Sequence, residues 1–235
     1  MNLSYDLHIH SCLSPCGDND MTPANIAGMA SILGLDVIAI TDHNTCRNCA
    51  PAMIHAEKYG IICIPGMELT TSEEIHAVCL FPNLEKALDF DSYVYERLMK
   101  FPNREDIFGQ QLILDEKDEL IEKEPNLLIN ATNISFEGLW ELVDSYNGVM
   151  FPAHIDKASH SLISSLGVIS DTNKFETAEL KDMKNFHAIK KANPYLNKCT
   201  IVSNSDAHYL EHIREPNLSI LCRERSIQGV LDALR

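Results

Sequence analysis

The first 82 residues alternate short apolar, β-branched runs with segments of helical periodicity. The runs that predict strands are LSYDLHI, LDVIAI, GIICIPG and IHAVCLF. Between the first two, Thr22 and Pro23 are typical of a helix N-cap and first helical position, and this helix is expected to end near Gly34. A second helix is expected over residues 50–59, before Gly60. This alternation favours an α/β fold with a parallel sheet or barrel.

The pattern changes after residue 82 and returns after residue 147. Residues 83–147 are mostly helix-favouring and hold 15 Asp and Glu against 6 Lys and Arg, a balance typical of a solvated helical face. Strand-like runs then resume with GVMFPAHI, FETAEL, CTIVSNSD and LSILC, and helices are expected at 182–191 and 226–234. We therefore expect a barrel built from residues 1–82 and 148–235, with 83–147 as an acidic, mainly helical inserted subdomain and a candidate cap.

Side chains of the metal-binding type stand at or beside the ends of six predicted strands. In an α/β barrel these strand ends form one rim, so residues distant in sequence can converge there. Residues i and i+2 of a strand face the same way, so His8 and His10 can bind one ion together, as can Asp206 and His208. Taken alone, the His8 and His10 pair is weak evidence, His43 is as consistent with a turn residue, and His76 or His154 with a hydrogen-bonded core histidine. The set as a whole predicts metal binding. Its members are His8, His10, Asp42, His43, Glu68, His76, His154, Asp206 and His208.

In this order the motifs resemble those of the PHP family, named for polymerase and histidinol phosphatase. The matching segments are DLHIH, ITDHN, GMEL, EIHAV, PAHID and NSDAH. The resemblance implies an α/β fold, a distorted (β/α)7 barrel, here with a mainly helical insertion. It also implies two to three divalent metal ions, Zn, Mn or Fe, at the strand ends.

The resemblance also implies which residues hold each ion. The first ion would be held by His8, His10, Glu68 and Asp206. Glu68 would bridge to a second ion held by His76 and His154. His43 and His208 would share a third ion with a residue of the loop after His10, for which Asp18 is preferred over Asp20 and Cys16 because of its spacing from Thr22.

Relatives with these motifs hydrolyse phosphate esters with a water activated by the metals. Our first hypothesis is therefore a metal-dependent phosphoesterase that acts on a small phosphorylated metabolite or a nucleotide. Asp42 or Asp206 is expected to relay a proton, and Lys157, Arg47 and His160 are candidates to bind the phosphate.

Three other functions remain open at this stage. One is an exonuclease or oligonucleotide phosphodiesterase, and another is a non-catalytic domain that uses the PHP fold for binding. The third is an amidohydrolase-type hydrolase, which is disfavoured because no predicted strand end offers the lysine that such sites carbamylate. These patterns predict neither the substrate nor the oligomeric state.

The composition of the chain limits its expected binding partners and its expected cellular compartment. The net charge of −15 argues against duplex nucleic acid as a partner, because such binding rests on basic surfaces. With no run of 18 apolar residues and no signal-peptide pattern, we expect no membrane contact and a cytoplasmic protein. Eight cysteines are too few for a disulfide scaffold of this length. The Cys46 and Cys49 pair leaves open a structural, redox or additional metal role.

Overall fold

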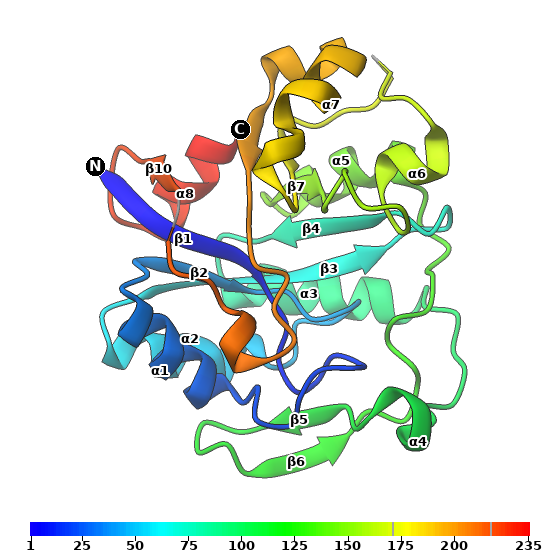
Figure 1. Cartoon of the computed structure of the whole chain (residues 1–235). Coiled ribbons are helices and arrows are strands. Elements are labelled where there is room, and N and C mark those ends of the chain that lie inside the picture. Colours follow the sequence, from blue (N-terminus) through cyan, green and yellow to red (C-terminus); the bar gives the residue numbers. More distant parts are fainter. Residues whose placement is uncertain (171, 217) are drawn as a thin grey trace.

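The computed structural model describes residues 1–170, 172–216 and 218–235. Its central feature is a curled six-stranded sheet with the strand order β10-β1-β2-β3-β4-β7 (Figure 1). Its strands are β1 (Asn2–Ile9), β2 (Val37–Ile40), β3 (Ile62–Thr70), β4 (His76–Leu80), β7 (Val149–Pro152) and β10 (Ser219–Leu221). Every residue of β2, β4 and β7 is buried, as expected for strands covered on both faces.

The strands β1, β2 and β3 are parallel to one another, as the alternation of strand and helix predicts. The expectation of a parallel arrangement is wrong for β4, which runs antiparallel to both β3 and β7. Only residues 71–75 connect β3 to β4, and a connection that short can join only antiparallel neighbours. The described strands also fall into three sheets rather than one closed ring of seven.

A separate pair of parallel strands, β8 (Thr177–Glu179) and β9 (Thr200–Val202), lies between the two ends of the curl. On one side the Ile155 amide, just after β7, donates to the Glu179 carbonyl at 2.9 Å. On the other side the His10 amide donates to the Ala207 carbonyl at 3.0 Å, so the chain after β9 runs along the end of β1. The carboxyl ends of β1, β3, β8 and β9 therefore surround one common space.

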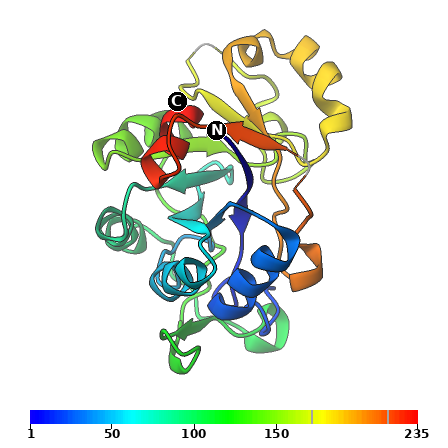
Figure 2. The same cartoon turned by 90° about the vertical axis from the view of Figure 1, so that its left-hand side faces the viewer.

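The helix expected after Thr22 is confirmed as α1 (Pro23–Leu33). The Thr22 hydroxyl accepts a hydrogen bond from the Asn25 amide, and Gly34 ends the helix with φ of +73°. α2 (Cys49–Lys58) follows β2, and both helices pack beside β1–β3 (Figures 1 and 2). The remaining helices outside residues 83–147 are α6 (Leu162–Leu166), α7 (Phe186–Ala192), α8 (Ile227–Leu234) and three 3₁₀ helices at Met183–Asn185, Pro194–Lys198 and Leu210–His212.

Residues 83–147 form helices and a β-hairpin between the adjacent strands β4 and β7. The helices are α3 (Leu84–Tyr95), α4 (Glu105–Phe108) and α5 (Phe136–Ser145); the hairpin joins β5 (Leu112–Leu114) to β6 (Leu120–Lys123). The hairpin and α4 lie at the opposite end of the molecule from β8, β9 and α7 (Figures 1 and 2). Phe90 of α3 and Phe136 of α5 belong to the main hydrophobic core, so these two helices are part of the barrel packing.

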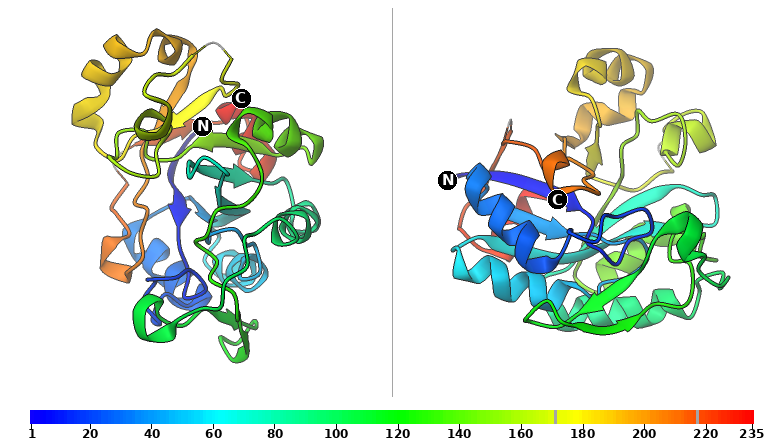
Figure 3. Two further views of the ribbon diagram at one scale, coloured as in Figure 1. Left: turned by 90° about the vertical axis from the view of Figure 1, so that its right-hand side faces the viewer. Right: turned by 60° about the horizontal axis from the view of Figure 1, so that its bottom comes forward.

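Both termini lie on the same side of the molecule (Figure 3). The N-terminal ammonium donates to the Cys222 carbonyl at 2.7 Å, because β10 pairs antiparallel with the first residues of β1. This pairing leaves the other end of β1, with His8 and His10, free to face the common space. No helix in the described part of the chain is long and apolar enough to cross a membrane.

Candidate metal centre

Glu68, near the end of β3, lies at the centre of a group of histidines. Its side chain is buried, and Oε1 lies 3.0 Å from His76 Nδ1, 3.1 Å from His154 Nε2 and 3.2 Å from His8 Nε2. These three imidazoles come from β4, from the end of β7 and from β1. Three imidazoles from separate segments of the chain thus lie around one carboxylate oxygen.

The second oxygen of Glu68 faces a different pair of imidazoles. Oε2 lies 3.1 Å from His43 Nδ1 and 3.4 Å from His10 Nε2. Neither this oxygen nor His43 Nδ1 makes a hydrogen bond within the described residues. Glu68 therefore has the position expected of a carboxylate that bridges two cation sites.

Four groups converge where β1 meets the chain after β9. His8 Nε2 lies 3.1 Å from His10 Nε2, and Asp206 Oδ1 lies 3.6 Å from the first nitrogen and 3.4 Å from the second. With Glu68 these atoms form a set whose members all lie within 4.8 Å of one another. Ligands about 2.1 Å from an ion at tetrahedral angles stand about 3.4 Å apart, so the observed spacing fits a divalent cation.

Glu179, the last residue of β8, determines the orientation of His8. Its carboxylate accepts a hydrogen bond from His8 Nδ1 at 3.1 Å, and also from the His154 amide at 2.8 Å and Asn204 Nδ2 at 2.7 Å. Because a carboxylate at neutral pH only accepts, His8 carries its proton on Nδ1 and turns Nε2 toward the centre. A carboxylate behind a ligating histidine is a common arrangement in metal sites.

A comparable chain of contacts orients His10. The Ser14 hydroxyl donates to Asp42 Oδ1 at 2.6 Å, so its oxygen accepts a hydrogen bond from His10 Nδ1 at 2.9 Å. Asp42 also accepts from the Ser11 amide at 2.7 Å and the Ser11 hydroxyl at 2.6 Å. Both oxygens of Asp42 are therefore occupied behind the centre, on the side of the loop after β1.

The donor atoms fit a cation in this space. With both Nδ1 atoms protonated, His8 and His10 direct lone pairs at each other across 3.1 Å, next to carboxylate oxygens of Glu68 and Asp206. Such a set of lone pairs repels itself unless a positive charge lies between them. Imidazole nitrogen and carboxylate oxygen are the ligands of zinc, iron and manganese, so the residues present fit the divalent ions that the motifs imply.

A third set brings together His10, His43 and His208, whose ring nitrogens lie within 4.8 Å of one another. The candidate ligand Asp18 is close to this set through its backbone, since its amide donates to the His208 carbonyl at 2.9 Å. The Asp18 side chain instead accepts from the Asp20 amide at 2.8 Å. Asp18 belongs to none of the three close-spaced sets of metal-type residues, which are His8, His10, Glu68 and Asp206; His43, Glu68 and His76; and His10, His43 and His208. The alternatives Asp20 and Cys16 are exposed.

Burial and mutual contact shift the titration of these groups. Burial favours a raised pKa for Glu68, but the imidazoles of His76, His8 and His43 hold its pKa well below the usual range. Burial favours a lowered pKa for His8, but Glu179, Glu68 and Asp206 raise it well above that of an ordinary imidazole. Without a metal, a proton on His8 thus supplies the positive charge that the carboxylates require.

Two lysines lie beside Asp206 at the partly exposed edge of the centre, which we call its mouth. Lys157 Nζ donates to Asp206 Oδ2 at 2.5 Å, and Lys181 Nζ lies 3.4 Å from the same oxygen. The Lys157 and Lys181 side chains are 37% and 32% exposed, whereas that of Asp206 is 8% exposed. A phosphate that approaches Asp206 from solvent would therefore meet two cations.

The other two phosphate-binding candidates, His160 and Arg47, contact different parts of the protein. The His160 ring stacks on that of His76, with centroids 4.8 Å apart, and the His160 carbonyl accepts from the His76 amide at 3.0 Å. Arg47 forms ion pairs with Glu124 and Glu122, so the structure brings it to the segment 83–147 and away from the three sets.

The Cys46 and Cys49 thiols are buried under the sheet. Both donate to the Gly66 carbonyl, at 3.1 and 3.4 Å, and neither belongs to a metal-type set in the described part of the chain. Burial raises the pKa of the Cys46 thiol well above its usual value. A thiol held in its protonated form is a poor ligand and a poor nucleophile, so the placement favours a structural role.

The sequence patterns missed two residues of this site, Ser14 and Lys181, and gave Glu179 no role beyond that of a strand-end residue at the rim. The position of Glu179 at the end of the strand-like run FETAEL was a usable signal, because it matches the positions of the metal-type residues. Ser14 and Lys181 carried no signal of this kind. Their roles depend on a loop turn and on the distance between separate segments.

The fold resembles that of solved phosphoesterases and nucleases. Endonuclease Q from Pyrococcus furiosus, a lesion-specific endonuclease, superposes with a TM-score of 0.68 and 20% identity, over 100% of this chain and 56% of that one. A metal-dependent phosphoesterase from Bifidobacterium adolescentis superposes with a TM-score of 0.60 and 17% identity, over 87% of each chain. At these identities the likeness shows the fold.

One curated relative is the 5′-3′ exoribonuclease of Haemophilus influenzae, with 37% identity over 83 residues. The match covers 34% of this chain and 29% of the relative, so the chain matches less than a third of that protein's length.

The exclusion of duplex nucleic acid that we based on net charge is wrong. Endonuclease Q, whose fold this chain shares with a TM-score of 0.68, has been solved with a 27-mer duplex at its active site. The net charge of the whole chain does not describe the potential at one site. Here Lys157 and Lys181 surround the mouth, and bound cations would add further positive charge.

A model of the PHP domain matches residues 6–227, which is nearly the whole chain and includes every motif described above. The convergence of the DLHIH, TDH, EIHAV, PAHID and SDAH segments around Glu68 agrees with that match. We conclude that the chain belongs to the PHP domain family.

Proposed function

We propose that the protein is a metal-dependent phosphodiesterase that removes nucleotides from the 5′ end of single-stranded nucleic acid. The observation that carries this proposal is the set of five imidazoles around Glu68, spaced as ligands of divalent cations and open to solvent past two lysines. The similarity to an exoribonuclease favours an oligonucleotide over the small phosphorylated metabolite that we first expected.

Three sets of residues would hold the cations. The first would be His8, His10, Glu68 and Asp206. The second would be Glu68, His76 and His154, although the close-spaced set at this place is His43, Glu68 and His76, with His154 Nε2 3.1 Å from Glu68 Oε1. The third would be His43 and His208 beside His10, with Asp18 as the expected further ligand. When bound, such ions lower the pKa of a water ligand and offset the negative charge of the phosphate.

The chain's own residues position these ligands and the substrate. Glu179 and Ser14 keep the Nε2 lone pairs of His8 and His10 directed inward. Lys157 and Lys181 stand where the non-bridging oxygens of a phosphodiester would arrive, and each can exchange part of its contact with Asp206 for such an oxygen. Proton transfer by Asp206 or Asp42 remains a prediction from the sequence; in the structure Asp206 is the one that faces the mouth.

Restricted access to the metal centre would favour cleavage at the end of a nucleic-acid strand. Most of the candidate ligands are nearly inaccessible, and the most exposed side chains at the centre are His208, 23% exposed, and the two lysines. The hairpin and α4 of residues 83–147 pack on the loop after β1, since the Cys16 amide donates to the Phe108 carbonyl at 2.8 Å. We therefore retain this segment as a proposed cap that limits access.

The proposal is tested by loading the full chain with Mn²⁺ and following 5′-labelled and 3′-labelled single-stranded RNA and DNA. Release of mononucleotides from the 5′ end is expected, without release of inorganic phosphate from sugar phosphates. The double variant His8→Ala/His10→Ala should lose this activity, while His55→Ala on α2, outside the centre, should keep it. Phosphate release from monoesters with intact oligonucleotides would contradict the proposal.

A further inference from the structure

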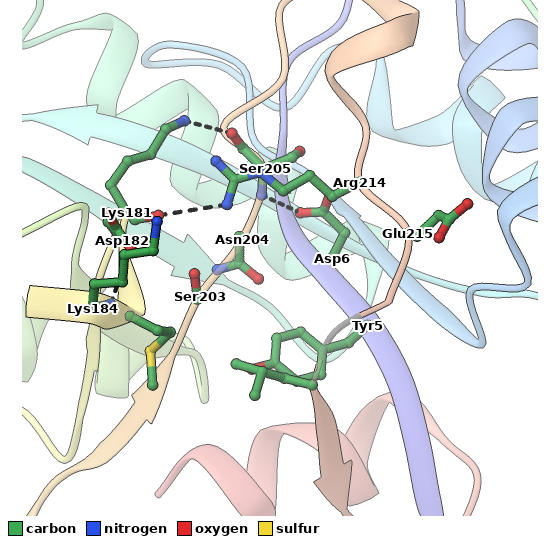
Figure 4. A pocket seen from close by; sticks show the side chains of 12 residues that line it. Tyr5, Asp6, Lys181, Asp182, Lys184, Ser203, Asn204, Ser205, Arg214 and Glu215 are labelled. Carbon is green, nitrogen blue, oxygen red and sulfur yellow. Dashed lines mark hydrogen bonds between the residues drawn. The ribbon is translucent and has the colours of Figure 1, made fainter. Parts of the chain in front are cut away.

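A cavity of about 420 Å³ lies beside the metal centre (Figure 4). Its walls come from the middle of β1, from the chain just after β9 and from the segments around Lys181 and Arg214. It shares a wall with the centre, because Ser205 lines the cavity and the next residue is Asp206. Apart from Lys181, none of the residues that line it takes part in the function proposed above.

The end of the cavity near the centre is cationic. Lys181 Nζ donates to the Ser205 carbonyl at 2.6 Å and lies 3.4 Å from Asp206 Oδ2, while Arg214 Nη1 donates to the Lys181 carbonyl at 3.5 Å. Lys184 also lines the cavity. Across residues 1–170, 172–216 and 218–235, neither Lys184 Nζ nor the Arg214 guanidinium forms an ion pair with a carboxylate, although the Lys184 backbone amide donates to Asp182 Oδ1 at 2.9 Å. Lys181, Lys184 and Arg214 thus place three cations in the lining, which also contains the carboxylates of Asp182 and Glu215.

The other end of the cavity is apolar. Figure 4 shows Tyr5 at this end, away from Lys181 and Arg214, with Asp6 between Tyr5 and Arg214. Met183 and Leu218 are the other large apolar residues of the lining. Asp6 is 2% exposed. Its Oδ1 accepts from the Ser205 amide at 3.1 Å, but its Oδ2 has no hydrogen-bond partner among the residues described. A buried carboxylate oxygen without a donor is costly unless a ligand or water supplies one.

We propose that this cavity is a nucleotide subsite that holds the nucleotide next to the scissile phosphate; the inference rests on the proposed nuclease function. The sugar-phosphate would lie at the cationic end, beside the centre, and the base would lie against Tyr5. Asp6 would accept a hydrogen bond from a ring N–H or an exocyclic amino group of the base.

The division of the cavity into two ends favours a nucleotide over a simple anion. A free phosphate would use Lys181 and Arg214 and leave the apolar end and Asp6 without a role. A volume of about 420 Å³ is also within the range of small-molecule sites, about 300–1,000 Å³. A nucleotide uses the anionic, polar and apolar parts together, and its phosphate end faces the centre where the phosphodiester would be cleaved.

The test uses the full-length chain and two substrates that share the reacting group. One is bis(p-nitrophenyl) phosphate, which has no nucleoside, and the other is a trinucleotide. In Mn²⁺-loaded protein, Arg214→Gln removes one cation, and Met183→Trp fills the apolar end from a partly exposed position. Each variant is expected to lower the ratio of kcat/KM for the trinucleotide to that for the simple diester about tenfold, as loss of one charge-assisted contact or of the base site would. Lys190→Gln, on α7 and outside the cavity lining, is the matched control and should change neither value.

Direct binding separates this inference from the proposed activity. Titration calorimetry of metal-free protein with adenosine 5′-monophosphate and with inorganic phosphate is expected to show tighter binding of the nucleotide, weakened about tenfold by Met183→Trp. If the wild type cleaves no diester but binds the nucleotide in this way, the activity fails and the subsite stands. Unchanged kcat/KM ratios together with unchanged nucleotide binding in both variants would overturn the subsite. Equal affinity for nucleotide and phosphate would reduce the cavity to an anion site and also overturn it.

Discussion

Glu179 accepts a hydrogen bond from His8 Nδ1 at 3.1 Å, and both side chains are fully buried or nearly so. The contact joins the end of β8 to the end of β1, two strands that belong to different sheets. It leaves His8 Nε2 directed at Glu68 and Asp206. The orientation of the first proposed metal ligand therefore depends on a carboxylate that does not itself reach the centre.

Replacement of Glu179 by Gln should weaken metal binding. An amide can present its NH₂ group to His8 Nδ1 and so favour the other tautomer, and outer-shell changes of this kind typically cost about 10- to 100-fold in metal affinity. Titration of the metal-free variant with Mn²⁺ measures the effect. Glu176→Gln, on the same segment but exposed, should bind like the wild type. Wild-type affinity in Glu179→Gln would show that the contact has no part in ligand orientation.

Metal binding should release at least one proton. Although burial lowers the pKa of His8, its three carboxylate neighbours raise it well above that of an ordinary imidazole, so at about pH 7 the metal-free protein still holds this proton. Protonation of His8 therefore stabilises the folded, metal-free protein. That contribution is complete below the pKa of an unfolded histidine and is lost as the pH rises through the raised pKa of His8.

Calorimetry of Mn²⁺ binding in two buffers with different ionisation enthalpies measures this proton. Heat that differs between the buffers and an affinity that falls as the pH is lowered are expected, because Mn²⁺ competes with the proton for His8. Identical heats in the two buffers would mean that His8 is already neutral before the metal binds.

Lys157→Met should reduce turnover of a phosphodiester without reducing the number of bound ions. Lys157 Nζ donates to Asp206 Oδ2, whereas Asp206 Oδ1 is the oxygen that faces His8 and His10. Loss of one charge-assisted contact to the phosphate is expected to lower kcat/KM by at least about tenfold. Lys157→Arg should retain part of the activity, and the exposed Lys174→Met serves as the control. A loss of bound ions in Lys157→Met would instead assign the lysine to holding Asp206 in place.

The double variant Cys46→Ser/Cys49→Ser should keep the wild-type metal content. Both thiols donate to the Gly66 carbonyl, belong to none of the metal-type sets in the described residues, and are buried. Burying two hydroxyls in place of thiols is expected to lower the free energy of unfolding by about 1–3 kcal/mol for each imperfectly bonded group. Metal analysis and thermal unfolding separate the two effects. Loss of one equivalent of metal would assign these cysteines to an ion.

The metal-type residues could be placed from the sequence because each stands at or beside one end of a recognisable strand, and strand ends meet in this class of fold. The strand directions could not all be placed. β4 is antiparallel because the turn before it is short, and His76 opens that strand rather than ending it. Glu68 still reaches His76 because the two residues stand near the same end of the β3–β4 pair.

The hairpin within residues 83–147 was not predicted, for a local reason. The run LILDEKDELIEK is rich in helix-favouring Leu, Glu and Lys. Asp115 overrides that preference, because its carboxylate accepts from the Lys117 and Glu119 amides at 2.8 and 2.9 Å and Asp118 adopts a positive φ of 58°. A side chain that bonds its own backbone turn is not visible in composition.

The proposed cap can be shortened without cutting the main core, although Ile113 is then lost from a small buried cluster with Leu13, Leu98 and Leu128. The Asn103 amide donates to the Pro125 carbonyl at 2.8 Å, so the two ends of the segment 104–124 lie side by side and can be joined directly. This segment contains α4 and the hairpin but neither α3 nor α5, whose phenylalanines belong to the main core.

Excision of residues 104–124 should retain metal binding and relax substrate selection. The segment covers the loop after β1, since the Leu112 amide donates to the Cys12 carbonyl at 2.9 Å, and it holds Arg47 through Glu124. Without it, the side of the centre formed by the loop after β1 is open to longer and paired chains. Rates on single-stranded and duplex oligonucleotides of equal length should therefore become more similar than in the wild type. Discrimination equal to that of the wild type, with metal content retained, would show that the segment does not cap the site.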